Sequence, residues 1–118
     1  MAPSLGVVMD PIATIKPYKD STLAMLLAAQ ARGWPLWYVE LGDLYLAGDR
    51  CHARMRPVEV RDDRRDWFSL GAARDAPLDE LPVVLMRKDP PVDMEYIHAT
   101  QLLELAERRG TLVVNRPA

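Results

Sequence analysis

A pattern that occurs twice along the 118 residues limits the possible folds of this chain more than any other feature of its sequence. In the first instance a short apolar run, Leu5–Met9, stops at Asp10, as a strand buried on both faces does. A helical segment follows from Asp20 or Ser21 to Arg32, and Gly33 ends it. Leu36–Glu40 is then rich in aromatic and β-branched residues. A strand, a helix and a strand in this order predict parallel pairing with a right-handed crossover.

The same pattern returns near the end of the chain. Val83–Met86 predicts another buried strand, and a charged stretch, residues 87–89, followed by two prolines ends it. We expect a helix from Asp93 to Arg109, where Gly110 stops it. Thr111–Val114 completes the second strand–helix–strand unit. The inner apolar stripe of this helix is formed by Ala99, Leu102, Leu103 and Ala106.

The segment between the two units has a different periodicity. Leu44–Leu46 and Cys51–Val60 predict a β-hairpin around a turn at residues 47–50, and Pro57 places the return strand at an edge of the sheet. Residues 61–74 are charge-rich, and we expect a surface loop or an irregular helical turn with Trp67 and Phe68 turned inward. The predicted fold class is α/β, with a mostly parallel sheet, two βαβ units and an inserted β-hairpin.

Composition restricts the classes of partner. The chain has 15 basic and 17 acidic residues, a net charge of −2, and no basic block, so nucleic acid is not an expected partner. The run Leu5–Met9 is too short to span a membrane, and no targeting segment is visible. Cys51 is the only cysteine, which excludes a disulfide framework and favours a cytoplasmic location. The length fits a single domain, residues 1–118, that can bury a core without disulfides.

Charged residues gather where the predicted parallel strands end. In an open parallel sheet the ligand crevice lies beyond the carboxyl ends of the strands. Asp10 follows the first strand there, and Arg87, Lys88 and Asp89 follow the third buried strand, while Ser21 at the start of the first helix is a candidate anion site. Such a rim of both signs suits a zwitterionic small molecule, with Arg87 holding a carboxylate and an aspartate accepting from an ammonium. The alternative is that these charges form a solvated loop and pair with one another.

The remaining reactive residue types favour structural roles. His52 and His98 lie far apart, with no Cys, Asp or Glu at metal-ligand spacing around them, so no metal site is expected. Cys51 has no readable His or Asn partner and is expected to be a buried or edge thiol rather than a nucleophile. The sequence contains neither a G-x-G-x-x-G motif nor a Walker A motif, so it gives the chain alone no evident means of using ATP.

A series of specific sequence blocks runs in order along nearly the whole chain. The most distinctive are Val-Met-Asp-Pro-Ile at residues 8–12 and Met-Arg-Lys-Asp-Pro-Pro at residues 86–91. Shorter blocks stand at residues 19–22, 32–33, 42–45, 67–69 and 110–115. Together these blocks resemble the N-terminal part of the bacterial glutathione synthetases.

The resemblance implies a Rossmann-like pre-ATP-grasp domain, followed in the full enzyme by an ATP-grasp unit that this chain lacks. The family reaction ligates γ-glutamylcysteine and glycine to glutathione, with ATP hydrolysed to ADP and phosphate. By the resemblance, Asp10, Arg87, Lys88 and Asp89 line the side of the cleft that binds γ-glutamylcysteine or glutathione. ATP and Mg²⁺ would be held by the absent part, so no catalytic residue or cofactor is assigned to this chain, and we expect the isolated chain to be inactive.

Two other functions and two partners follow from the same observations. The chain could belong to another ATP-grasp carboxylate-amine ligase, or be a non-catalytic binding or oligomerisation module. The first helical segment has no charged residue from Ser21 to Ala31, which is typical of a helix covered on more than one side. The expected partners are the protein's own C-terminal ATP-grasp domain and further copies in a homo-oligomer.

Overall fold

The structure is a computed structural model that describes residues 4–14, 21–63, 65–87 and 94–115. Its two α-helices within these ranges are α1 (Ser21–Ala31) and α2 (Met94–Arg108). The strands are β1 (Leu5–Val8), β2 (Leu36–Val39), β3 (Leu44–Ala47), β4 (Arg50–Val60), β5 (Phe68–Leu70), β6 (Arg74–Pro77), β7 (Val83–Met86) and β8 (Leu112–Asn115). Both helices end at glycines with positive φ, Gly33 at 80° and Gly110 at 108°, as the sequence predicts.

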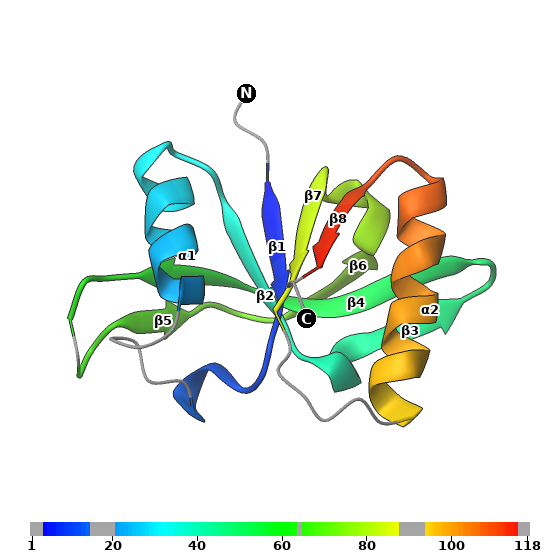
Figure 1. Ribbon diagram of the computed structural model, residues 1–118, viewed down its shortest axis with the longest axis horizontal. Coiled ribbons are helices and arrows are strands. Elements are labelled where there is room, and N and C mark those ends of the chain that lie inside the picture. Colours follow the sequence, from blue (N-terminus) through cyan, green and yellow to red (C-terminus); the bar gives the residue numbers. More distant parts are fainter. Residues whose placement is uncertain (1–3, 15–20, 64, 88–93, 116–118) are drawn as a thin grey trace.

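The strands described here form one mixed, curled sheet (Figure 1). The order is β3-β4-β2-β1-β7-β8, and β5 and β6 also pair with β4. β1 pairs in parallel with β2 and β7, and β7 pairs in parallel with β8. All pairings of β4 are antiparallel. The expected mostly parallel sheet is therefore not confirmed, because the hairpin strands join the same sheet and make it mixed.

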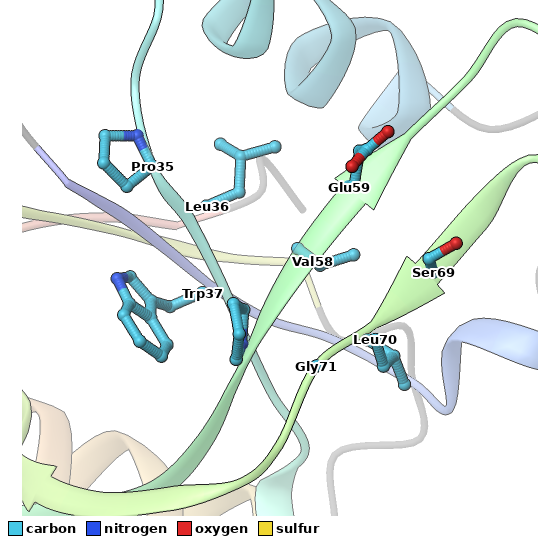
Figure 2. Close-up of a pocket in the computed structure, with 9 residues that line it drawn as sticks. Pro35, Leu36, Trp37, Val58, Glu59, Ser69, Leu70 and Gly71 are labelled. Atoms are coloured by element: carbon cyan, nitrogen blue, oxygen red, sulfur yellow. The ribbon is translucent and has the colours of Figure 1, made fainter.

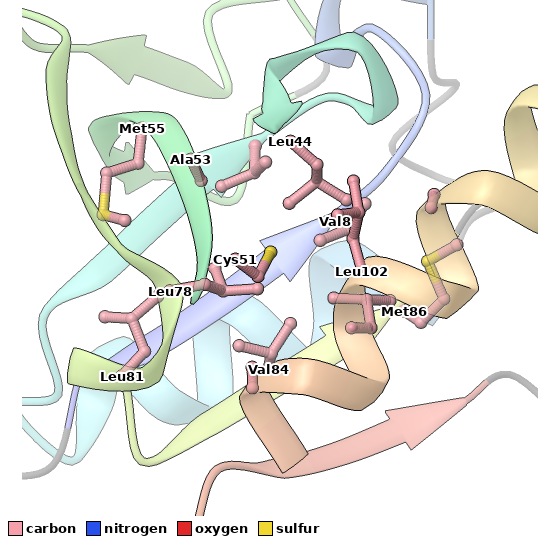
Figure 3. Packing of buried hydrophobic residues seen from close by; sticks show 14 of the residues in the cluster. Val8, Leu44, Cys51, Ala53, Met55, Leu78, Leu81, Val84, Met86 and Leu102 are labelled. Carbon is pink, nitrogen blue, oxygen red and sulfur yellow. The ribbon is translucent and has the colours of Figure 1, made fainter. Parts of the chain in front are cut away.

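The two helices lie on opposite sides of the parallel strands (Figure 1). Side chains alternate between the two faces along a strand, so neighbours such as Val7 and Val8 enter different cores. Val7 packs in the core that contains α1 residues, such as Leu26. Val8 packs in the core that contains α2 residues, with Met86 and Leu102 (Figure 3). The inner stripe of α2 is confirmed, since Ala99, Leu102, Leu103 and Ala106 are its buried residues.

The β-hairpin is confirmed, but its predicted edge position is wrong. β3 and β4 pair in antiparallel fashion, with Leu44 opposite Ala53. β4, however, lies inside the sheet and pairs with β2, β3, β5 and β6. Pro57 is accommodated opposite Trp37, and its carbonyl accepts a hydrogen bond of 2.8 Å from the Gly71 N–H. Gly71 itself leaves no room for a side chain, since an added Cβ would lie 2.6 Å from Cγ of the Pro57 ring.

The prediction for residues 61–74 is wrong in one respect. This segment contains β5, which pairs with the last residues of β4, instead of only loop or helical turn. Trp67 is buried, as expected, and Phe68 packs partly buried against the same core. Arg61 and Asp66 pair across the turn, with Nη2 and Oδ1 3.0 Å apart. This ion pair spans the turn that brings the short strand β5 back onto β4.

Ion pairs connect the β-hairpin, through Asp79, to a residue outside it. The Arg50 guanidinium donates to Asp79, and Nε of Arg109 lies 3.8 Å from Oδ2 of the same carboxylate. The hydrogen bond from Arg50 holds the pKa of Asp79 below its usual range, although burial opposes this shift. Because the folded-state pKa lies below the unfolded value, this stabilisation is present near neutral pH and is lost as the pH falls through the folded-state pKa.

Candidate functional site

Asp10 and Arg87 lie at the same edge of the sheet. Val8 of β1 stands opposite Met86 of β7 in the parallel register, so both chains leave the sheet at the same level. The backbone N–H of Arg87 donates to the Val8 carbonyl at 2.7 Å. Both side chains are partly buried. Two members of the predicted rim are thus brought together by adjacent strands that are distant in the sequence.

The Arg87 guanidinium is held at the start of α1. Its Nε donates a hydrogen bond of 3.2 Å to Oγ1 of Thr22, whose side chain is buried. Thr22 lies in the first turn of α1, where the dipole of the helix adds positive potential to that of the guanidinium. A fixed cation beside a helix N-terminus can hold a carboxylate. Thr22 is absent from the sequence-based candidates, and its only signal there is its place at the beginning of a helix.

The other predicted rim residues have different outcomes. Ser21 is the first residue of α1, as expected, and its role in binding an anion stays a prediction. Lys88 and Asp89 lie outside the described residues. The ligand contacts proposed for them therefore also stay predictions.

A second polar group near the same edge is not among the residues predicted from the sequence. The Tyr38 hydroxyl accepts a hydrogen bond of 3.0 Å from the Ile12 N–H and donates one of 2.6 Å to Oε2 of Glu40. Burial and the hydrogen bond to Glu40 raise the pKa of Tyr38, so the phenol keeps its proton at neutral pH. The hydroxyl thereby ties the segment after β1 to the carboxyl end of β2. In the sequence, the only sign of this polar group is Glu40, a charged residue at the end of an otherwise apolar strand.

Cys51 and the histidines do not join this edge. Cys51 is buried, and burial followed by the nearby charge of Asp79 raises its pKa to about 11, so it stays a thiol at neutral pH. The His52 ring packs 5.6 Å from the Tyr45 ring, and His98 is exposed on α2. In the part of the chain that the structure describes, no three His, Cys, Asp or Glu side chains gather as metal ligands.

Another groove lies elsewhere on the molecule. It has a volume of about 430 Å³ and is formed around the amino end of β2, with Pro35, Trp37 and Leu70 among its lining (Figure 2). Glu59 is the one charged residue in the part of its lining that the structure describes. The ligand crevice expected for parallel strands is at the opposite, carboxyl end, so this groove is not the candidate site.

No helix within the described residues is long and apolar enough to cross a membrane.

Comparison with known proteins gives one consistent result. The family model for the N-terminal domain of prokaryotic glutathione synthetase matches residues 4–118. The glutathione synthetase of Pseudomonas putida is 61% identical over 117 residues, which are 99% of this chain and 37% of that protein. The glutathione synthetases of Yersinia pestis and Escherichia coli K12 are 58% and 54% identical over 113 residues, 96% of this chain and 35% and 36% of theirs. The chain thus spans little more than a third of the length of these relatives.

Proposed function

Since the chain belongs to the family of prokaryotic glutathione synthetase N-terminal domains, we propose that it is the substrate-side domain of a glutathione synthase. This enzyme would ligate γ-glutamylcysteine and glycine and hydrolyse ATP to ADP and phosphate. The proposal rests mainly on the similarity to relatives named glutathione synthetase, which extends over nearly the whole chain at 54–61% identity. The alternatives are another ATP-grasp carboxylate-amine ligase and a non-catalytic binding module. In either case the residues at this edge would not bind γ-glutamylcysteine.

The domain proposed for residues 1–118 is a Rossmann-like pre-ATP-grasp domain. The parallel pairs β1–β2 and β7–β8 support it, because each encloses one helix in the sequence. In the longer protein an ATP-grasp unit would follow and hold ATP and Mg²⁺, which neutralises phosphate charge during the phosphorylation of a carboxylate. The described residues of this chain would supply binding and orientation of the dipeptide, not the groups that act on ATP.

In this proposal the dipeptide binds where Asp10 and Arg87 leave the sheet. γ-Glutamylcysteine carries two carboxylates and one ammonium, so it needs fixed groups of both signs. The Arg87 guanidinium, fixed through Thr22, is suited to one carboxylate, and Asp10 to the ammonium. Lys88 and Asp89 would complete the rim, and the start of α1 at Ser21 would attract an anionic group.

We also propose that the protein is cytoplasmic and that it forms homo-oligomers through the outer face of α1. This helix has no charged residue from Ser21 to Ala31, and a groove of about 290 Å³ lies beside it, lined by Met25, Trp34 and other largely apolar residues. An uncharged helix suits a second copy of itself, because no charge on the helix has to be paired or repelled. Among the described residues that line the groove, Arg32 is the one that carries a charge. A sedimentation mass equal to one chain would contradict this part of the proposal.

The function is tested on the full-length protein that contains this chain. We expect ADP release only when γ-glutamylcysteine and glycine are both present, with glutathione formed in equal amount. The isolated chain should release no ADP under the same conditions. Ligation of a different pair of amino acids or peptides would overturn the substrate assignment, and absence of any ATP-dependent ligation would favour a non-catalytic module.

A further inference from the structure

A small polar pocket lies between β2 and β4. It has a volume of about 170 Å³ and is lined by Tyr38, Glu40, Asp43, Arg54, Arg56 and Leu70. Arg54 and Arg56 are two residues apart on one strand, so they lie on the same face about 7 Å apart along it. Arg56 stands opposite Tyr38 in the antiparallel register.

The two guanidinium groups of this pocket have unused hydrogen-bond donors. Within the described residues the structure records no hydrogen bond and no ion pair for the side chain of Arg54 or Arg56. This contrasts with Arg50 on the same strand, which is paired with Asp79. Each guanidinium carries five N–H donors in a planar fork that matches a carboxylate.

The two carboxylates of the pocket are only partly occupied. Oε2 of Glu40 accepts from the Tyr38 hydroxyl, and Oδ2 of Asp43 accepts from the Glu40 N–H at 3.0 Å. A carboxylate offers about four acceptor positions, so both keep capacity for further donors. The hydrogen bonds also fix the positions of the two groups before any ligand arrives. Among the described residues that line the pocket, two cations and two anions give no net formal charge.

This balance discriminates between classes of ligand. A phosphate dianion would gain from the arginines but be repelled by Glu40 and Asp43, and a simple cation would meet the opposite conflict. A group that carries a carboxylate and an ammonium side by side can satisfy both pairs. We propose that this pocket binds the α-amino-acid end of a small molecule, with its carboxylate on Arg54 and Arg56 and its ammonium on Glu40 and Asp43.

The pocket is connected to the edge that carries Asp10. The Ile12 N–H, two residues beyond Asp10, donates to the Tyr38 hydroxyl that lines the pocket. In γ-glutamylcysteine the γ-glutamyl group has a free α-amino-acid end, so it is the natural occupant. Its one ammonium then binds Glu40 and Asp43 in place of Asp10, and Arg87 holds the carboxylate of the cysteinyl residue. This identification of the molecule rests on the proposed function, whereas the preference of the pocket for an α-amino-acid end does not.

Binding is tested by NMR titration of the ¹⁵N-labelled 118-residue chain with L-glutamine, which has the same α-amino-acid end and a γ-amide. We expect saturable shifts of the amides of residues 38–43 and 54–56, with a Kd of about 1 mM, as for a ligand of this size held by few contacts. Acetate, methylammonium and inorganic phosphate, each tested alone, should bind at least about tenfold more weakly, because each satisfies only one sign of charge.

Variants separate specific binding from general charge effects. Arg56→Gln and Arg54→Gln should each weaken L-glutamine binding by about tenfold or more, through loss of a charge-assisted hydrogen bond. Arg108→Gln, at an exposed position on α2, is the matched control and should leave binding unchanged. Amide signals remote from the pocket report whether each variant is folded. Absence of saturable shifts, equal binding of phosphate, or equal effects of Arg108→Gln and Arg56→Gln would overturn the proposal.

A second measurement separates this proposal from the proposed function. In the full-length protein Arg56→Gln should raise KM for γ-glutamylcysteine and leave KM for ATP unchanged. If L-glutamine binds the pocket but the full-length protein shows no ligase activity, the proposed function fails and the pocket assignment stands. If the ligase is active and its KM for the dipeptide does not respond to Arg56→Gln, the assignment of the γ-glutamyl group to this pocket is wrong.

Discussion

Replacing Arg87 by alanine in the full-length protein is expected to raise KM for γ-glutamylcysteine by about 10- to 100-fold. A hydrogen bond between charged groups contributes about 1.5–3 kcal/mol, and each 1.4 kcal/mol changes affinity about tenfold. KM for ATP should change by less than about twofold, because in the proposed function ATP is held by another part of the protein. Steady-state kinetics with one substrate varied at a time gives both constants.

The matched control for this prediction is Thr22→Val. This variant keeps the guanidinium but removes the hydroxyl to which its Nε donates. It should raise KM for the dipeptide less than Arg87→Ala does, because the cation remains while its orientation loosens. If Arg87→Ala raises KM for the dipeptide and for ATP equally, Arg87 does not belong to the dipeptide site.

Replacing Leu102 by alanine is expected to lower the free energy of unfolding by about 2–5 kcal/mol. Leu102 is 4% exposed and packs between α2 and the sheet, beside Val8, Val84 and Met86 (Figure 3). The truncation removes apolar contacts and leaves a cavity that the surrounding strands cannot fill without moving. Small domains have stabilities of about 5–15 kcal/mol, so this is a large part of the total.

Urea unfolding of the 118-residue chain measures this loss. The midpoint should fall while the slope of the free energy against urea concentration stays the same. Glu104→Ala, at an exposed position two residues along the same helix, should change stability by less than about 0.5 kcal/mol. A similarly small change for Leu102→Ala would mean that α2 is not packed on the sheet as the structure has it.

Local patterns in the sequence predict the helices and strands whose apolar residues form a continuous run or recur at a regular period. Val83–Met86 is apolar throughout because both its faces are covered, and its predicted bounds are those of β7. The stripe on α2 follows the 3.6-residue period, and Gly110 marks its end because only glycine readily adopts the φ of 108° found there.

The failures have a common physical cause, which is pairing between distant strands. Pro57 indicates an edge strand by its missing N–H, but a strand that pairs with several short neighbours has positions where no donor is needed. Phe68–Leu70 has only three residues, and the charged residues 61–66 before it dominate the pattern of the segment. Both results depend on where β4 runs in the sheet, which no local pattern specifies.

The candidate site shows the same division. Asp10 and Arg87 can be predicted because they follow two apolar strands, and parallel strands end at one edge. The bond from Arg87 to Thr22 joins residues 65 positions apart, and that from Ile12 to Tyr38 joins residues 26 positions apart. Such contacts depend on side-chain directions in the finished fold, so a single sequence gives no sign of them.

The path of β4 links the two halves of the molecule during unfolding. Its first residues, Cys51, Ala53 and Met55, belong to the core under α2, and Val58 and Val60 belong to the core under α1. Because β4 contributes to both cores, neither core can open fully without disturbing the backbone hydrogen bonds of β4. We therefore expect damage under one helix to spread to the other, so that the chain unfolds as one cooperative unit and not in two stages.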